Sequence, residues 1–444
     1  MFQQDFGVEE FRARRRRMCD AAGPGAWILV PGAPGRQGND GFRQYNEFYY
    51  LCGVEVPHAY LLVNSANAKT TLFLPRESLA KPQEEGEPVH ADNADYVKGA
   101  TGVDAAAGLE LLPQHVQRAS AIYLPFEELE DRSVSRDTLR NWYQGVMADP
   151  LDGRLTRSAH IVDVVRRRYP QIEVRNLSPI VDELRLIKSP REIEMLRRAG
   201  HLTAVGVNEA MRSTRSGVME YQLDAVLRYH FLAGGAMDRG YFSLIPSGAN
   251  IFHGHYHANR HELKDGDWLL CDAAPDYGYY TSDIGRMWPV NGKYSPRQRA
   301  LYGYVVEYHK ALLARIRPGR MLTEIALEAA EAMRPVFERW EFGSGDDRAS
   351  AALMFEFRGH LSHCVGMAVH DGGLHHTRPL APGVVFSVDP TLLDRERKLY
   401  VRVEDTVAVT ETGIENLTAE APLELDDVEK MMRGKGLLQA FPPA

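Results

Sequence analysis

Two aspartates, Asp272 and Asp283, constrain the fold of this chain more than any other feature of its sequence. Residues 267–272 read as a buried strand, and the alternation of side chains along a strand places Asp272 on its apolar face. A carboxylate buried there protonates unless a cation, hydrogen-bond donors or a metal ion stabilises its charge. Residues 275–278 have turn chemistry and residues 279–283 are predicted to return as a second strand, so a hairpin would bring the two carboxylates together. Such a pair favours a shared metal ion, and two turn aspartates without a ligand role are the alternative.

The length and charge of the chain limit the classes of protein to which it can belong. Its 444 residues exceed what one hydrophobic core usually serves, which predicts two domains. A net charge of −8 with interspersed signs argues against nucleic-acid and membrane partners and favours small-molecule or peptide partners. The 4 cysteines are scattered, and no apolar run reaches the roughly 18 residues of a transmembrane helix. The basic run at residues 12–17 does not precede a signal-peptide core, so a soluble, cytoplasmic protein with reduced thiols is expected.

The first part of the chain has the pattern of an α/β domain. Short apolar strands alternate with turn-rich segments and amphipathic helices. The predicted strands are residues 26–30, 59–63 and 70–74, and the predicted helices are residues 11–19, 109–117 and 160–169. This part shows no recognisable catalytic arrangement of side chains. The pattern changes between residues 170 and 183, where a domain boundary is expected.

Long amphipathic helices dominate the second part. Ser189 and Glu192 form a predicted capping box with proline at the first helical position, and Ser295 and Gln298 form another. A further helix is predicted at residues 221–232, before a glycine pair. No GxGxxG sequence follows a strand, so nucleotide binding is not indicated.

Histidines and acids that could bind a metal ion recur on both sides of the aspartate pair. Histidines stand at positions 253, 255, 257, 360, 363, 370, 375 and 376. Residues 401–409 alternate valines with Arg402 and Glu404, and the apolar run 384–388 ends just before Asp389. Each signal alone has an ordinary interpretation: a polar loop for the histidines, a solvated edge for the polar strand face, and a turn for Asp389.

Taken in order, five residues form a pattern that resembles a known family. They are Asp272, Asp283, His363, Asp389 and Glu404. Two spaced aspartates, then one histidine and two late acids, are similar to the pita-bread dinuclear metallopeptidases, which include aminopeptidase P, prolidase and methionine aminopeptidase. The resemblance to bacterial aminopeptidase P covers nearly the whole chain and is also carried by residues 45–53, 183–193, 255–256, 281–286 and 413–418.

The resemblance implies an α/β (α+β) protein with two domains. An amino-terminal α/β domain, residues 1–176, would precede a pita-bread (creatinase/aminopeptidase-like) catalytic domain, residues 177–444. The implied activity is that of a metal-dependent Xaa-Pro aminopeptidase, which hydrolyses the bond between an amino-terminal residue and a following proline through a metal-bridging hydroxide. The implied partners are a peptide with proline in second position and further copies of the chain, in a dimer or tetramer assembled through the amino-terminal domains.

The same resemblance implies a set of metal ligands. Asp272 would bind one ion, Asp283 and Glu404 would bridge both ions, and His363 and Asp389 would complete the shell of the other. Oxygen-rich ligation with one imidazole and no thiolate suits two divalent ions, with manganese as the first choice and zinc or cobalt as alternatives.

Further residues match catalytic positions of the family. His255 and His370 match histidines that contact substrate or transfer protons, which a neutral imidazole can do near pH 7. Arg402 matches an arginine that orients the acids. Asp389 stands where the family has its usual candidate for the general base.

Two departures from the family pattern lie near these residues. The family has glutamate before proline and glycine, where residues 389–391 read Asp-Pro-Thr. The shorter side chain withdraws the carboxylate by roughly 1.5 Å, so either the backbone moves inward or the site changes. The family's preceding histidine is shifted by one position, to His360. These departures leave two alternatives open: a related pita-bread hydrolase that acts on a dipeptide or another amide, and a binding protein whose metal site has decayed.

Overall fold

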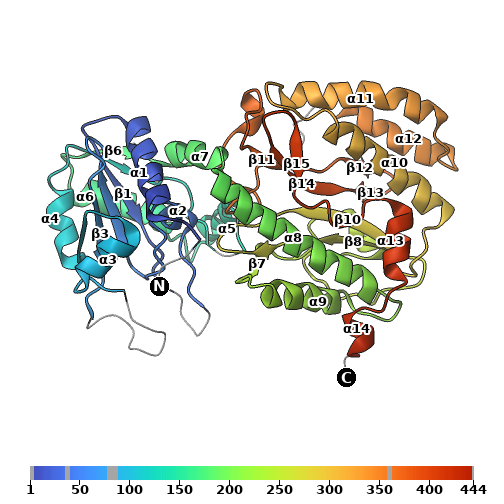
Figure 1. Cartoon of the computed structure of the whole chain (residues 1–444), viewed down its shortest axis with the longest axis horizontal. Coiled ribbons are helices and arrows are strands. Elements are labelled where there is room, and N and C mark those ends of the chain that lie inside the picture. The colour runs from blue at the N-terminus through green and yellow to red at the C-terminus, as the bar shows by residue number, and fades with distance from the viewer. Residues whose placement is uncertain (1–4, 36–40, 78–88, 132, 358–362, 443–444) are drawn as a thin grey trace. The chain divides into compact units, whose positions relative to one another are not determined.

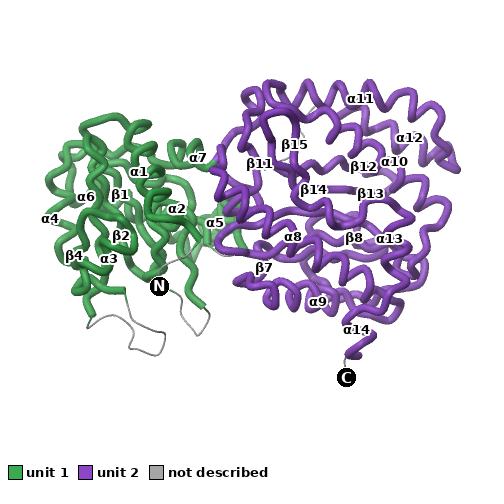
Figure 2. The backbone as a smooth tube through the Cα atoms, in the orientation of Figure 1, with its two compact units in different colours: residues 1–185 green, residues 186–444 purple. Residues whose placement is uncertain are grey.

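The protein forms two compact units in the computed structural model, residues 1–185 and 186–444 (Figure 2). The structure describes every residue except 1–4, 36–40, 78–88, 132, 358–362 and 443–444. The division lies within the helix α7 (Ser178–Leu186), whereas the sequence pattern placed the boundary between residues 170 and 183 and the family resemblance implied residue 176. Across the described residues, no helix is both long enough and apolar enough to cross a membrane.

The first unit is built on a mixed sheet with the strand order β4-β3-β2-β1-β5-β6 (Figure 1). Its strands are β1 (Trp27–Pro31), β2 (Tyr60–Asn64), β3 (Thr70–Leu74), β4 (Ala105–Gly108), β5 (Ala121–Leu124) and β6 (Glu173–Asn176). Its helices, besides α7, are α1 (Val8–Ala22), α2 (Asn46–Cys52), α3 (Ala94–Thr101), η3 (Leu109–Leu111), α4 (Leu112–Val116), α5 (Arg136–Ala148) and α6 (Arg157–Arg168). The predicted strands and helices of this part are confirmed to within a few residues at their ends.

The second unit contains an antiparallel sheet with the strand order β11-β14-β10-β8, and β15 lies beside β14. Its strands are β7 (Asp238–Arg239), β8 (Trp268–Asp272), β9 (Pro275–Asp276), β10 (Ile284–Pro289), β11 (Val385–Val388), β12 (Thr391–Asp394), β13 (Leu399–Arg402), β14 (Glu404–Val409) and β15 (Ile414–Asn416). Its helices are α8 (Pro190–Ser213), α9 (Glu220–Ala233), η4 (Gly248–His253), α10 (Pro296–Leu313), α11 (Leu322–Arg339), α12 (Gly345–Ala352), η5 (Leu353–Glu356), η6 (His375–Thr377), α13 (Leu425–Met432) and α14 (Leu437–Ala440). Helix α8 packs on α9, and α10 packs on α11 (Figure 1).

Local sequence determines where the long helices of this unit begin. The Ser189 hydroxyl accepts a hydrogen bond from the backbone N–H of Glu192 (3.3 Å), and the Glu192 carboxylate accepts one from the N–H of Ser189 (3.0 Å). Ser295 and Gln298 exchange the same pair of bonds before α10. Both predicted capping boxes are therefore confirmed, and each satisfies two donors that a helix start leaves unpaired.

The strand that returns after Asp272 begins later than the sequence predicted. The hairpin itself is confirmed, because β8 and β10 pair antiparallel with Asp272 opposite Gly285. The prediction of a strand at residues 279–283 is wrong: Tyr279 has a positive φ of 74°, which a strand does not allow, so the turn extends further along the chain. Asp283 consequently stands just before β10 rather than at the end of a strand.

The close packing of α8 gives a test of this fold. A Cβ atom on Gly200 would lie 2.2 Å from the backbone carbonyl oxygen of Leu417. Because a backbone atom cannot rotate away as a side chain can, Gly200→Ala should lower the free energy of unfolding by about 1–3 kcal/mol, as other overpacked interiors do. Gly345→Ala is the matched control in the same unit, since a Cβ atom added there would have no neighbouring atom within 4 Å. Scanning calorimetry that gave both variants the same melting temperature would contradict this packing.

Candidate metal centre

Three predicted ligands come together beside β10 and β14, the inner strands of the antiparallel sheet. Asp283, His363 and Glu404 each offer a ligand atom, and these atoms all lie within 4.8 Å of one another. Strand pairing explains the meeting of the two acids, because Gly285 of β10 lies opposite Glu404 of β14. The His363 Nε2 atom lies 3.3 Å from Asp283 Oδ2. These three residues could hold a metal ion.

Asp272 lies beside this cluster and is joined to it by two other side chains. The Tyr241 hydroxyl lies 2.6 Å from Asp272 Oδ1 and 2.8 Å from Asp283 Oδ1, so the two acids share its single donor proton. Arg402 forms an ion pair with the second oxygen of Asp272, and its Nη2 atom lies 3.3 Å from Glu404 Oε2. Tyr241 was not predicted, because a single tyrosine far from the acids in sequence reads equally well as a core residue.

The electrostatics of the acids favour a bound cation. Burial, followed by repulsion from Glu404 and Asp272, raises the pKa of Asp283 well above its usual value. Burial likewise raises the pKa of Glu404, although Arg402 opposes the shift. Glu404 Oε2 is buried, and among the described residues its contact is the ion pair with Arg402, with no hydrogen bond of good geometry. A divalent ion among these carboxylates would remove the repulsion between them.

The state of His363 also fits a metal ligand. Burial, then the neighbouring His370, lowers its pKa to about 3, so the imidazole is neutral. With the Nδ1–H donating to the carbonyl oxygen of Cys364 (3.3 Å), the Nε2 lone pair faces Asp283 and the hydroxyl of Ser387. Two acceptors cannot face each other at 3.3 Å without a proton or a metal ion between them, so the residues present fit a divalent ion.

The other predicted site residues lie around this cluster. Asp389 follows the end of β11 and, with His363, lines a cavity of about 580 Å³ whose apolar wall comes from α11 and η5. The rings of His363 and His370 are in contact, with centroids 4.1 Å apart. Partial burial lowers the pKa of His255. The negative charge of Asp272 opposes this shift, and the positive charge of Arg402 adds to it. Asp272 and Asp389 are thus neighbours of the three-residue cluster rather than members of it, and His360 lies outside the described residues.

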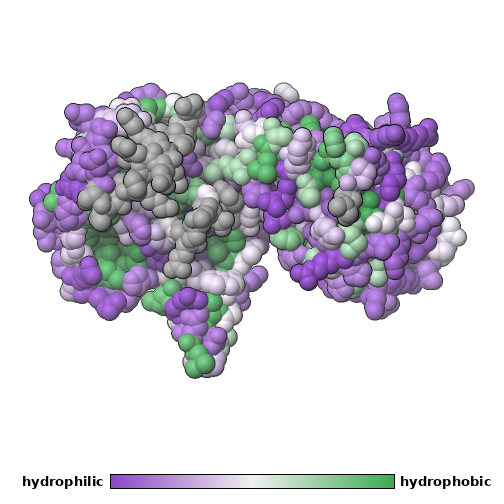
Figure 3. All heavy atoms as spheres, turned by 90° about the horizontal axis from the view of Figure 1, so that it is seen from below, coloured by the Kyte–Doolittle hydropathy of each residue, from purple (hydrophilic) through white to green (hydrophobic). Residues whose placement is uncertain are grey.

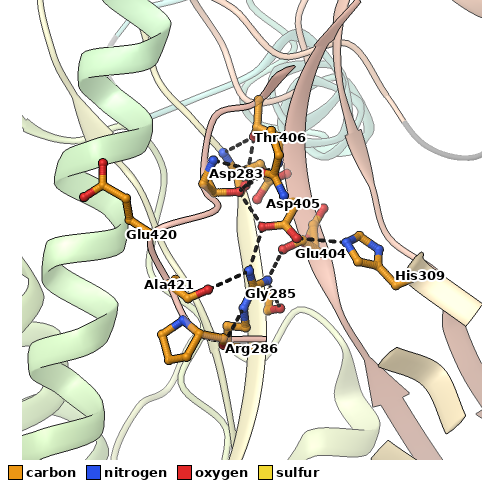
Figure 4. Close-up of polar contacts among 12 residues, drawn as sticks. Asp283, Gly285, Arg286, His309, Glu404, Asp405, Thr406, Glu420 and Ala421 are labelled. Atoms are coloured by element: carbon orange, nitrogen blue, oxygen red, sulfur yellow. Dashed lines mark hydrogen bonds and ion pairs between the residues drawn. The ribbon is translucent and has the colours of Figure 1, made fainter. Parts of the chain in front are cut away.

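The opposite face of the sheet holds the two acid-bearing strands in register (Figure 4). Arg286 donates to the Asp405 carboxylate (2.6 Å) and to the carbonyl oxygen of Glu404 (2.5 Å). His309 and Thr418 also bond to Asp405, at 2.8 Å and 2.5 Å. Although burial acts to raise the pKa of Asp405, Arg286 and these hydrogen bonds hold it far below its usual value. Asp405 was not singled out from the sequence, because it shares its face of the strand with valines.

Thr406 also links β14 to the residue just before β10. Its hydroxyl donates to the carbonyl oxygen of Asp283 (2.8 Å) and accepts from the N–H of Asp283 (2.8 Å). The alternating run 401–409 is divided at Val403 between β13 and β14, so Arg402 and Glu404 belong to different strands. The Arg402 guanidinium nevertheless contacts both Asp272 and Glu404, so this polar face is buried at the site and is not a solvated edge.

Comparison with known proteins relates both units to one family. Residues 11–123 match the N-terminal domain of aminopeptidase P, and residues 194–411 match metallopeptidase family M24. The chain is 30% identical over 447 residues to the Xaa-Pro aminopeptidase of Escherichia coli K12, which covers 96% of this chain and 97% of that protein. It is 30% identical to human Xaa-Pro aminopeptidase 3, over 88% of this chain and 76% of that protein.

Solved structures show the same fold. Aminopeptidase P from E. coli with the inhibitor Pro-Leu superimposes with a TM-score of 0.77 at 29% identity, covering 97% of this chain and 99% of that one. The zinc-substituted E. coli protein in complex with product gives a TM-score of 0.76 at 27% identity, over the same 97% and 99%. The predicted fold class, an amino-terminal α/β domain followed by a pita-bread catalytic domain, is confirmed. The chain therefore belongs to metallopeptidase family M24, and within it carries the amino-terminal domain of aminopeptidase P.

Proposed function

We propose that the protein is a metal-dependent Xaa-Pro aminopeptidase, which removes the amino-terminal residue from peptides with proline in second position. The observation that carries this proposal is the cluster of Asp283, His363 and Glu404, in a chain 30% identical to an Xaa-Pro aminopeptidase along 96% of its length. Membership of a metallopeptidase family implies hydrolysis with divalent metal ions. The names of the relatives support the proline specificity, and they give no support to the dipeptide hydrolase or to a decayed binding protein.

The ligand set that we propose extends the observed cluster by two neighbouring acids. Asp283, His363 and Glu404, together with Asp272 and Asp389, would hold two divalent ions. When bound, the ions supply Lewis-acid polarisation of the scissile carbonyl and activation of the attacking water. Oxygen-rich ligation favours manganese, and the zinc-substituted relative supports zinc as an alternative beside cobalt.

The remaining polar side chains hold these acids or meet the substrate. Burial and the adjacent acids keep the pKa of Tyr241 well above its usual value, so its hydroxyl stays neutral and its one proton is shared by an oxygen of Asp272 and an oxygen of Asp283. Arg402 balances the charge of Asp272 in the same way. His255, whose lowered pKa keeps it neutral near pH 7, contacts substrate or accepts a proton, and His370 has the same role beside His363.

We also propose a cytoplasmic homo-oligomer. The 4 cysteines are buried and unpaired with one another, which suits a reducing compartment. The surface of the first unit includes large exposed apolar side chains, among them Trp142, Met147 and Leu151, and apolar patches are visible on the molecule (Figure 3). Such side chains support assembly through the amino-terminal domain into a dimer or tetramer.

Removal of metal tests the proposed activity directly. A tripeptide with proline in second position should be cleaved after its first residue, and dialysis against a chelator should abolish cleavage, because oxygen ligands hold divalent ions exchangeably. Added manganese should restore it. A tripeptide with alanine in place of proline is the control and should remain intact. Full activity in protein that elemental analysis shows to be free of metal would exclude the proposal.

Substitution of single residues tests the proposed roles. Asp283→Ala should abolish turnover while leaving the circular dichroism spectrum unchanged, because this acid belongs to the cluster that would hold the ions. His255→Ala should lower kcat by roughly 10²–10⁴-fold, the usual contribution of a proton-transferring group. Asp265→Ala, which removes an exposed carboxylate of the same unit, should have wild-type kinetics. Wild-type turnover in the His255 variant would show that its role is wrongly assigned.

The shorter acid at position 389 gives a further test. The Thr391 hydroxyl donates to the carbonyl oxygen of Asp389 (3.1 Å), so the turn is built around this pair of residues. The extra methylene of Asp389→Glu should therefore crowd the site, and the variant should bind manganese no more tightly than wild type and turn over more slowly. Titration calorimetry and steady-state kinetics on both proteins measure this. A gain in both affinity and turnover would mean that the backbone has not adjusted to aspartate.

A further inference from the structure

Residues 363–371 form a loop that carries two of the proposed functional histidines. His363 lies at its start and His370 near its end, and their rings are in contact. The loop folds back on itself, because the N–H of Asp371 donates to the carbonyl oxygen of Cys364 (2.9 Å). The N–H of Thr281 donates to the carbonyl oxygen of Gly366 (2.9 Å) and fixes the middle of the loop. The position of His370 therefore depends on how Asp371, the next residue, is held.

A buried ion pair holds Asp371. The Lys188 Nζ atom lies 3.0 Å from Asp371 Oδ2, and each of the two side chains is 1% exposed. The loop packs directly on this pair, since a Cβ atom on Gly366 would lie 2.1 Å from Asp371 Oδ2 and 3.0 Å from Lys188 Cε. Burying two charges costs desolvation free energy that their attraction need not repay, so stability alone does not explain the pair.

The backbone of Lys188 is itself fixed to the sheet. Its N–H donates to the carbonyl oxygen of Gly383 (2.9 Å), and the preceding residue, Ile187, forms a bridge with Val384. These two partners lead directly into β11, the strand that ends before Asp389. Lys188 thus connects the segment before β11, through its backbone, to Asp371 at the end of the loop 363–371, through its side chain.

We propose that Lys188 is a positioning residue for His370, acting through Asp371. This inference rests on the proposed function, because it assigns the ion pair to the same site. Lys188 contacts Asp371, the residue that follows His370, and does not itself act on the reacting atoms. Its loss removes the buried cation from Asp371 and lets the His370 ring shift. A displacement of about 1 Å in a catalytic group can cost on the order of 10²-fold in rate.

Replacement of both charges tests the proposal in protein that still folds. Lys188→Met combined with Asp371→Leu substitutes an apolar pair of similar volume, which in buried sites is often neutral or stabilising. This double variant should keep the melting temperature and manganese stoichiometry of wild type, while kcat for a proline-second tripeptide falls roughly 10- to 100-fold with KM little changed. Lys188→Arg, which keeps the cation, should retain most of kcat. Lys293→Met, which removes a lysine paired with Glu429 elsewhere in the unit, is the control and should match wild type.

A double-mutant cycle separates positioning from a general structural effect. If the ion pair acts through His370, its replacement should cost nothing further in the His370→Ala background. The same loss in both backgrounds would overturn the proposal, as would weaker manganese binding by the apolar double variant.

A readout that does not need activity distinguishes this proposal from the proposed function. The imidazole NMR signal of His370, assigned by its absence in His370→Ala, should shift in the apolar double variant and stay in place in Lys293→Met. An unchanged signal would overturn the positioning role. Failure of the wild-type protein to cleave any proline-second tripeptide would overturn the proposed function, and the NMR comparison would still decide the role of Lys188.

Discussion

The candidate site depends on one buried ion pair, between Arg286 and Asp405. Each side chain is 1% exposed, and the pair joins β10 to β14 directly behind the acids (Figure 4). Arg286 also donates to the backbone oxygen of Glu404, so it fixes the strand as well as its side chain. A register shift of one residue would turn Glu404 to the opposite face and away from Asp283. The pair therefore acts as a register lock, and removal of either partner would leave an uncompensated buried charge.

On the other face, the protein gathers negative charge that its own residues only partly balance. Asp272, Asp283 and Glu404 are each no more than 5% exposed, and Arg402 supplies the guanidinium that contacts two of them. Burial raises the pKa of both Asp283 and Glu404, so folding produces a site in which these two acids favour a bound cation. This unfavourable electrostatics is the usual mark of a functional site, because a core selected for stability alone would contain apolar side chains.

Features that depend on neighbours in sequence were predicted correctly. The capping boxes before α8 and α10, the apolar strands of the first unit and the hairpin between β8 and β10 all follow from local patterns. The prediction at residues 279–283 was wrong because the turn was taken to end at residue 278. Nothing in the sequence indicated the positive φ of Tyr279, which prolongs the turn. Asp405 was passed over because strand alternation placed it among valines, and alternation says nothing about a buried arginine on the next strand.

The sequence by itself determined the family pattern, the kinds of side chain available to a metal ion and the starts of the main helices. Only the tertiary structure decided which other side chains hold the acidic residues of the site in place. Tyr241 meets Asp272 and Asp283, Arg402 meets Asp272, and Lys188 meets Asp371, and the partners are far apart in the chain. The physical reason is that periodicity shows which face of an element is buried, whereas the identity of the facing element follows from the packing of the whole unit.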